Sequence, residues 1–137
     1  MRILFDTNVV LDLLLDRNPF ADDAAFLFGQ VEKAEIIGYL CATTLTTVHY
    51  LLTKALGVKV ANEHVRTLMA MFEVAAVNRL VIEEAIDLNF SDFEDAVLYQ
   101  AANHAGMNYI VTRNARDFKR STIPVYAPKE FISVMRS

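Results

Sequence analysis

Short apolar segments alternate with longer segments of helical period along this chain. In the longer segments, apolar residues recur every three or four positions, as on the buried face of an amphipathic helix. Strands that alternate with helices build a parallel sheet covered by helices on both faces. The sequence therefore predicts an α/β fold in three layers with about 4–5 parallel strands. The segments expected to form strands are residues 2–5, 36–41, 74–77, 109–111 and 125–126.

Capping signals mark several of the expected helices. Ser91 and Glu94 form a capping-box pattern, so we expect Ser91 to cap a helix that Gly106 ends. Thr43 and Thr44 are candidate caps of an earlier helix. The other expected helices cover about residues 9–15, 20–33 and 60–72, a segment after Asn78 as N-cap, and a closing segment from Lys129.

Length and composition limit the class of protein. A chain of 137 residues has the size of one domain, and we expect a single domain over residues 1–137. The apolar fraction is 54%, but charges interrupt every stretch before it reaches the length of a membrane helix. The chain opens on a strand rather than a signal peptide, and Cys41 is its only cysteine. We therefore expect a protein of the reducing cytoplasm, with Cys41 as core filler.

Asp6 directly follows the apolar run from Ile3 to Phe5. In open α/β folds, ligands and catalytic groups lie at the carboxyl ends of the strands, so Asp6 is a candidate site residue. A structural role explains it equally well, because Asp accepts backbone N–H groups at turns and helix N-caps.

Asp95 lies on the helix expected after Ser91 and shares one face with Leu98 and Ala102. A carboxylate beside a buried stripe is costly unless it is hydrogen-bonded or holds a metal ion. Asp92 lies one turn earlier, where the positive end of the helix dipole accounts for an acid without any function. Asp95 is thus the stronger candidate of the two.

Asp117 follows the strand that ends at Val111, so it leaves the same edge of the sheet as Asp6. We expect Asp6, Asp95 and Asp117 to converge there. Two carboxylates about 4 Å apart repel by roughly 4 kcal/mol at an effective dielectric constant of about 20. Either one carboxyl keeps its proton with a raised pKa, or a divalent cation binds. Oxygen ligands suit Mg²⁺ or Mn²⁺ rather than zinc.

Basic residues surround Asp117, although the net charge of the chain is −4. A nucleic-acid-binding domain usually presents a basic face, so the overall charge does not indicate one. The basic run is either an ordinary solvated loop or a place that holds RNA phosphates. Its members are Arg113, Arg116, Lys119 and Arg120.

Three segments together resemble the PIN domain family, in particular the VapC-like ribonuclease toxins of toxin–antitoxin pairs. The resemblance covers nearly the whole chain. It implies a metal-dependent endoribonuclease that uses Mg²⁺ or Mn²⁺, cleaves an RNA substrate, binds a cognate antitoxin and forms a homodimer. The matching segments, in the family's order, are Leu4–Asp12, Asp92–Ala96 followed by Ala101 and Ala102, and Ile110–Asn114 followed by Asp117 and Phe118.

The resemblance also implies roles for particular residues. Asp6 and Asp95 would be the principal metal ligands, and Asn114 and Asp117 would complete an acidic catalytic pocket. The basic run would hold neighbouring phosphates of the RNA. The residues in supporting positions are Asn8, Thr47 and Asp92.

One position departs from the family pattern. Many PIN domains carry an acid on the helix after the second strand, and Thr47 stands there in this chain. A threonine hydroxyl can hold a water but supplies no charge. The sequence therefore leaves open a weakened PIN fold that binds RNA or a partner without cleaving. A third interpretation, a phosphatase that forms an aspartyl-phosphate, requires a second Asp where this chain has Asn8.

Overall fold

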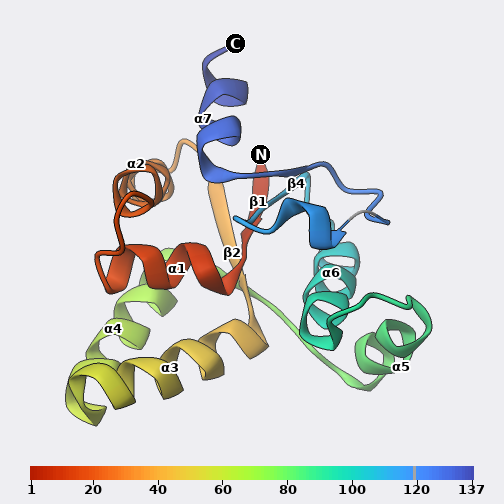
Figure 1. Ribbon diagram of the computed structural model, residues 1–137, viewed down its shortest axis with the longest axis horizontal. Coiled ribbons are helices and arrows are strands. Elements are labelled where there is room, and N and C mark those ends of the chain that lie inside the picture. Colours follow the sequence, from red (N-terminus) through yellow and green to blue (C-terminus); the bar gives the residue numbers. More distant parts are fainter. Residues whose placement is uncertain (119) are drawn as a thin grey trace.

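The computed structural model describes residues 1–118 and 120–137, and these contain one five-stranded sheet. All strands are parallel in the order β3-β2-β1-β4-β5, so β1 lies at the centre (Figure 1). Ile3 of β1 pairs with Gly38 of β2 on one side and with Tyr109 of β4 on the other. The strands are β1 (Arg2–Phe5), β2 (Ile37–Cys41), β3 (Glu73–Ala75), β4 (Tyr109–Val111) and β5 (Val125–Tyr126).

Helices cover both faces of the sheet, which confirms the three-layer α/β prediction. Ile3 and Phe5 join a core with α1, α2, α3, α4 and α7, whereas Leu4 points to the other face and joins a core with α5 and α6. Within the described residues, no helix is long and apolar enough to cross a bilayer. The helices are α1 (Thr7–Leu14), α2 (Ala21–Glu32), α3 (Ala42–Leu56), α4 (Val58–Met71), α5 (Arg79–Asp87), α6 (Phe93–Ala105), the 3-10 helix η1 (Ala115–Phe118) and α7 (Pro128–Arg136).

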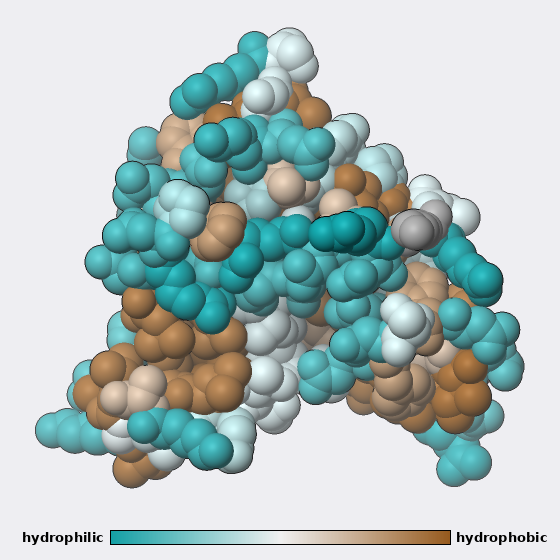
Figure 2. Space-filling view, in the orientation of Figure 1, coloured by the Kyte–Doolittle hydropathy of each residue, from teal (hydrophilic) through white to brown (hydrophobic). Residues whose placement is uncertain are grey.

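The helices form two arms beyond the carboxyl edge of the sheet. In Figure 1, α3 and α4 make the arm at lower left, and α5 and α6 make the arm at lower right. The surface is hollowed between the arms (Figure 2), and the carboxyl ends of β1 and β2 lead toward that hollow. Apolar side chains gather on the ends of both arms, so the two arms frame a more polar region (Figure 2).

The core packs closely around the aromatic rings of Phe5, Phe28 and Phe72. Their centroids lie 5.0–5.9 Å apart in edge-to-face arrangements. A Cβ at Gly38 would lie 2.6 Å from the Phe72 ring, so only glycine lets this ring rest against β2. Cys41 is fully buried, as expected of core filler. This packing holds β1 and β2 rigidly where their carboxyl ends meet the site.

The predicted elements are present, and the differences lie at their ends. Asn78 caps α5 as predicted, because its side chain accepts the backbone N–H of Val81 at 3.0 Å. Gly106 ends α6 in the left-handed conformation, with φ 73°. The caps predicted at Thr43 and Thr44 are wrong, since α3 already begins at the residue before them. The extended backbone before α3 allows the helix to start without a side-chain cap.

Candidate active site

The carboxylate of Asp6 lies at the carboxyl end of β1 and is 7% exposed. Its Oδ1 accepts the backbone N–H of Thr7 at 2.7 Å, and its Oδ2 accepts the hydroxyl of Thr112 at 2.8 Å. The amide of Asn8 donates a longer contact to Oδ2 at 3.4 Å. The structural explanation of Asp6 holds, because Asp6 is the N-cap of α1, and its carboxylate also lines a pocket.

This pocket has a volume of about 270 Å³ and lies where α1, α3, α6 and the segment after β4 meet. Carboxylates, hydroxyls, amides and two guanidinium groups line it together, so opposite charges share one cavity. Its polar residues are Asp6, Thr7, Asn8, Arg17, Thr43, Thr44, Thr47, Glu94, Asp95, Arg113 and Asn114.

Asp95 is a carboxyl group whose negative charge is disfavoured in this pocket. Burial raises its pKa from 3.8 to about 7, and the negative charge of Asp6 adds to the effect. Asp92, Asp117 and Glu94 raise this pKa further. Near neutral pH, Asp95 therefore holds a proton about half of the time, unless a cation enters the pocket.

Asp6 is affected in the same direction but is better compensated. Burial raises its pKa, whereas the hydrogen bonds from Thr112 and Thr7 lower it by stabilising the charged form. Both carboxyl groups of the pair are therefore driven toward the protonated form, and a shared proton or a bound cation would relieve their repulsion.

The capping box predicted at Ser91 is wrong. α6 begins at Phe93, and Asp92 is its N-cap, which accepts the backbone N–H of Asp95 at 3.2 Å. Ser91 with Glu94, and Asp92 with Asp95, are both acceptors followed three residues later by an acid, so the sequence allows either register. In the observed register Glu94 is released from capping and lines the pocket. Sequence reasoning missed it as a site residue.

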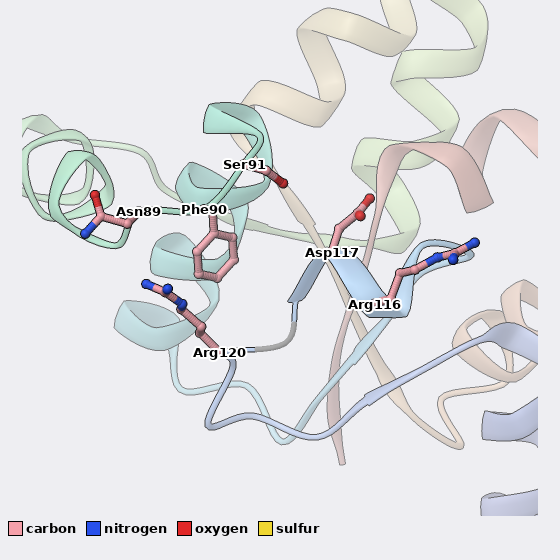
Figure 3. A pocket seen from close by; sticks show the side chains of 6 residues that line it. All are labelled: Asn89, Phe90, Ser91, Arg116, Asp117 and Arg120. Atoms are coloured by element: carbon pink, nitrogen blue, oxygen red, sulfur yellow. The ribbon is translucent and has the colours of Figure 1, made fainter.

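The structure places Asp117 in a cavity next to this pocket. It lies on η1, is exposed, and lines a cavity of about 220 Å³ (Figure 3). In Figure 3 the side chain of Ser91 points toward Asp117, whose carboxylate extends away from the Phe90 ring. Asp117 thus acts on Asp95 through its charge, while Asp6 and Asp95 share a pocket without it.

The donor set of the pocket fits a hard cation with few protein ligands. In residues 1–118 and 120–137, no three carboxylate, histidine or cysteine side chains lie close enough to hold one metal ion together. Asp6 and Asp95 remain as a pair, and the groups around them offer further oxygen atoms. Magnesium keeps several of its waters and binds through one or two carboxylates, so this pair fits such an ion better than zinc.

The predicted basic run divides between two places. Arg113 lines the acidic pocket, whereas Arg116 and Arg120 line the cavity of Asp117 (Figure 3). In that view Arg120 lies below the Phe90 ring and Arg116 extends to the opposite side. Lys119, the fourth member of the predicted run, lies outside the described residues.

Arg113 is held by Asp12, an acid on α1 that sequence reasoning left without a role. Asp12 is 1% exposed and accepts two hydrogen bonds from the Arg113 guanidinium, at 2.6 and 3.1 Å. Its other neighbour is Arg17, whose Nε lies 2.9 Å from Oδ1. The sequence does indicate a buried role for Asp12, because it stands between Leu11 and Leu13 in an apolar segment. A carboxylate buried there requires a cationic or hydrogen-bonding partner.

The α3 side of the pocket is lined by threonine hydroxyls. The hydroxyl groups of Thr7 and Thr44 lie 2.9 Å apart, and Thr44 is buried. Thr47 lies on α3 and lines the pocket with Asp6 and Asp95. Thr47 therefore lies beside the carboxylate pair and supplies only a neutral oxygen where the family resemblance implies an acid.

Comparisons with known proteins agree with this architecture. A model of the PIN domain family matches residues 2–116. Ribonuclease VapC1 of Aquifex aeolicus (strain VF5) is 26% identical in an alignment that covers 95% of this chain and 92% of the relative. FitAcB from Neisseria gonorrhoeae has a similar structure with a TM-score of 0.71 at 18% identity, covering 93% of this chain and 98% of that one. A toxin–antitoxin complex from Klebsiella pneumoniae matches with a TM-score of 0.68 at 23% identity, covering 92% and 97%.

Proposed function

The chain belongs to the PIN domain family, and we propose that it is an endoribonuclease that hydrolyses phosphodiester bonds of RNA as the toxin of a toxin–antitoxin pair. A relative that covers almost the whole chain is named a ribonuclease, and similar structures are described as toxin–antitoxin complexes. Such an enzyme meets its RNA in the cytoplasm. The observation that carries the proposal is the pair of crowded carboxylates, Asp6 and Asp95, at the carboxyl edge of the sheet.

Asp6 and Asp95 are the residues that would hold a divalent cation, Mg²⁺ or Mn²⁺. The raised pKa of both carboxyl groups supports this assignment, because a bound cation would relieve their repulsion. When bound, such an ion activates a water molecule and neutralises charge on the phosphate.

The other residues of the pocket have roles that follow from their positions. Thr112 and the backbone of Thr7 fix the orientation of the Asp6 carboxylate. Arg113, fixed in turn by Asp12, offers further N–H groups to a phosphate. Glu94 is exposed and suited to accept a proton at the mouth of the pocket.

The remaining polar groups act by hydrogen bonding and charge. The amides of Asn8 and Asn114 and the hydroxyl of Thr47 hydrogen-bond water or phosphate in the pocket. Asp117 lies in the neighbouring cavity and adds negative charge to the field around Asp95.

A cognate antitoxin would inhibit this site by inserting a positively charged side chain. An arginine or lysine placed between Asp6 and Asp95 relieves the same repulsion as a metal ion and excludes the substrate. An apolar groove of about 280 Å³ between α1, α2 and α4, lined by Leu14, Phe28 and Met71 among others, offers a surface for the apolar face of such a partner. A homodimer remains an expectation from the family resemblance.

Cleavage of RNA by the Asp95→Asn and Asp6→Asn variants tests the proposal. Asn keeps the shape of each side chain and remains a good N-cap at position 6. Both variants should cleave single-stranded RNA on the order of a hundredfold more slowly in Mn²⁺ than the parent protein. Glu35→Gln, an exposed change before β2 at the opposite edge of the sheet, is the matched control. Equal cleavage by all four proteins would exclude this pocket as the nuclease site.

A second function, RNA or partner binding without cleavage, is favoured by one observation. Thr47 brings no charge to the pocket at the position where an acid would face Asp6 and Asp95. Thr47→Glu adds a carboxylate on the α3 side of the pocket, so it should increase Mn²⁺-dependent cleavage if the missing acid limits the reaction. Asp95→Asn in that background should cancel the gain. If neither the parent nor Thr47→Glu cleaves RNA while both remain folded by circular dichroism, the binding function replaces the nuclease.

A further inference from the structure

A second cavity adjoins the acidic pocket on the side of α2 and α7. It has a volume of about 350 Å³ and lies near the first residues of these two helices. Arg113 lines both this cavity and the acidic pocket, so the two spaces are neighbours. Pro19, Phe20 and Pro128 form apolar walls, and Asp23 and Lys129 add one charge of each sign.

We infer that this cavity binds a nucleobase of the RNA strand, next to the phosphate held in the acidic pocket. The inference rests on the proposed function, and it assigns to that function a base-binding subsite made by Phe20, Arg113 and Lys129. Bases of single-stranded RNA are recognised by stacking on aromatic rings and guanidinium planes, combined with hydrogen bonds to their edges.

Phe20 supplies the stacking surface. Its side chain is 37% exposed and lines the cavity, so part of the ring is accessible to a ligand there. The Arg113 guanidinium lies 4.0 Å from the centroid of its ring, so an aromatic and a cationic plane meet at the entrance of the cavity. Two proline rings extend the apolar wall, which suits a flat base better than a hydrated ion.

The charges of the lining also favour a base over a phosphate. Asp23 repels a phosphate but accepts N–H groups, which every base except uracil carries as exocyclic amines and which uracil carries at N3. Lys129 donates hydrogen bonds to a ring nitrogen or carbonyl oxygen. A lining with both a donor and an acceptor therefore matches the edge of a base.

Arg113 links the base and the phosphate. Two of its N–H groups are held by Asp12, which fixes the guanidinium plane between the two cavities. The remaining N–H groups can donate to the phosphate while the plane borders the base. One side chain thus sets the distance from the bound base to the bond that is cut.

Binding of fluorescein-labelled single-stranded RNA, followed by anisotropy without divalent cations, tests the inference separately from cleavage. Phe20→Ala should weaken binding about tenfold, because it removes a stacking surface. Phe20→Tyr keeps the ring and should bind as tightly as the parent protein. Phe26→Ala is the matched control, since Phe26 is also 37% exposed and has Arg136 5.1 Å from its ring centroid. It should leave binding unchanged.

An RNA backbone without bases sharpens the test. Phe20→Ala should bind this base-free backbone as tightly as the parent protein does, because the stacking that the substitution removes requires a base. Equal binding of ordinary RNA by Phe20→Ala and Phe26→Ala overturns the subsite, even if the parent protein cleaves RNA and the proposed function stands. If Phe20→Ala shows the expected loss of RNA affinity but the parent protein does not cleave RNA, the subsite is supported and the nuclease function is rejected. Loss of antitoxin binding alone in Phe20→Ala would assign the cavity to a protein partner and overturn the inference.

Discussion

Two acids near the same edge of the sheet have opposite surroundings. Asp12 is buried and lies against the guanidinium groups of Arg113 and Arg17, so cations surround an anion. Asp95 is half-buried in a pocket with Asp6, and the largest charge effect on its pKa comes from that second acid. The first carboxylate is compensated within the chain, and the second is not.

The difference separates a structural acid from a functional one. A buried ion pair that is complete holds the fold, and removing one partner leaves the other charge unpaired. Crowded acids lower the stability of the protein on their own, and they persist where a bound cation or a reaction needs them. Removing Asp12 should therefore destabilise the protein, whereas removing the charge of Asp95 should stabilise it.

The largest expected effect is that of Asp12→Asn. It leaves Arg113 and Arg17 without their counter-charge, so the free energy of unfolding should fall by about 3 kcal/mol. Urea unfolding measures this change, and Glu35→Gln, an exposed substitution, should alter it little. If Asp12→Asn unfolds at the same urea concentration as the control, Asp12 is not a structural acid and the comparison is wrong.

A divalent cation should stabilise the protein through the other acid pair. At ten times its dissociation constant, Mn²⁺ should add about 1.4 kcal/mol to the free energy of unfolding. Thermal melting with and without the ion shows the gain. Asp6→Asn should lose it, and Glu35→Gln should keep it. A melting temperature that ignores both Mg²⁺ and Mn²⁺ would remove the metal from the proposed function.

Asp95 should contribute to the pH dependence of stability in the same direction as Asp6, because burial raises the pKa of both. The pKa of Asp95 is near 3.8 in the unfolded chain and about 7 in the folded protein, so the folded state holds the extra proton between these values. Stability of the metal-free protein should therefore fall as pH rises from about 4 to 7. Asp95→Asn should flatten this part of the profile and stabilise the protein by about 1 kcal/mol near pH 8, after allowance for solvent screening. A parent and variant with parallel profiles would contradict the raised pKa.

Among the substitutions around Asp12, Arg17→Ala should have the smaller effect. The Arg17 side chain is 40% exposed, and Arg113 still compensates Asp12 after the change. The free energy of unfolding should fall by only about 0.5 kcal/mol. The fully exposed pair of Arg79 and Glu83 provides a lower limit, because Arg79→Ala should cost less still. A loss as large as that of Asp12→Asn would mean that Arg17 is the principal partner of Asp12.

The sequence predicted the fold well because its strands are short, apolar and separated by clear helical periods. The segments 109–111 and 125–126 agree with β4 and β5 at both ends. Helix starts were less predictable. Ser91 and Asp92 are equally good caps by chemistry, and the backbone conformation, which tertiary packing sets, decides between them.

The site was predicted where a residue's place along the chain fixes its place in space. Asp6 follows the central strand and Asp95 lies on the apolar face of a helix, so both were found. Asp117 is separated from β4 by a short segment and lies on the 3-10 helix η1. The path of this segment determines which cavity the Asp117 side chain lines, and the sequence does not define that path. The position of Glu94 in the pocket depends on where α6 begins, which the sequence left open. Asp12 could have been recognised, because it is an acid among apolar neighbours.

The helix α1 connects Asp6, a member of the crowded acid pair, to the compensated acid Asp12 and sets their spacing. Asp6 caps its first turn and Asp12 lies near its end, about 9 Å further along the axis. One inserted residue between them would rotate Asp12 by about 100° away from Arg113 and bury a different side chain in its place. Over evolutionary time, this stretch can therefore change in composition but not in length. Relatives that keep both acids should differ by substitutions there and never by insertions or deletions.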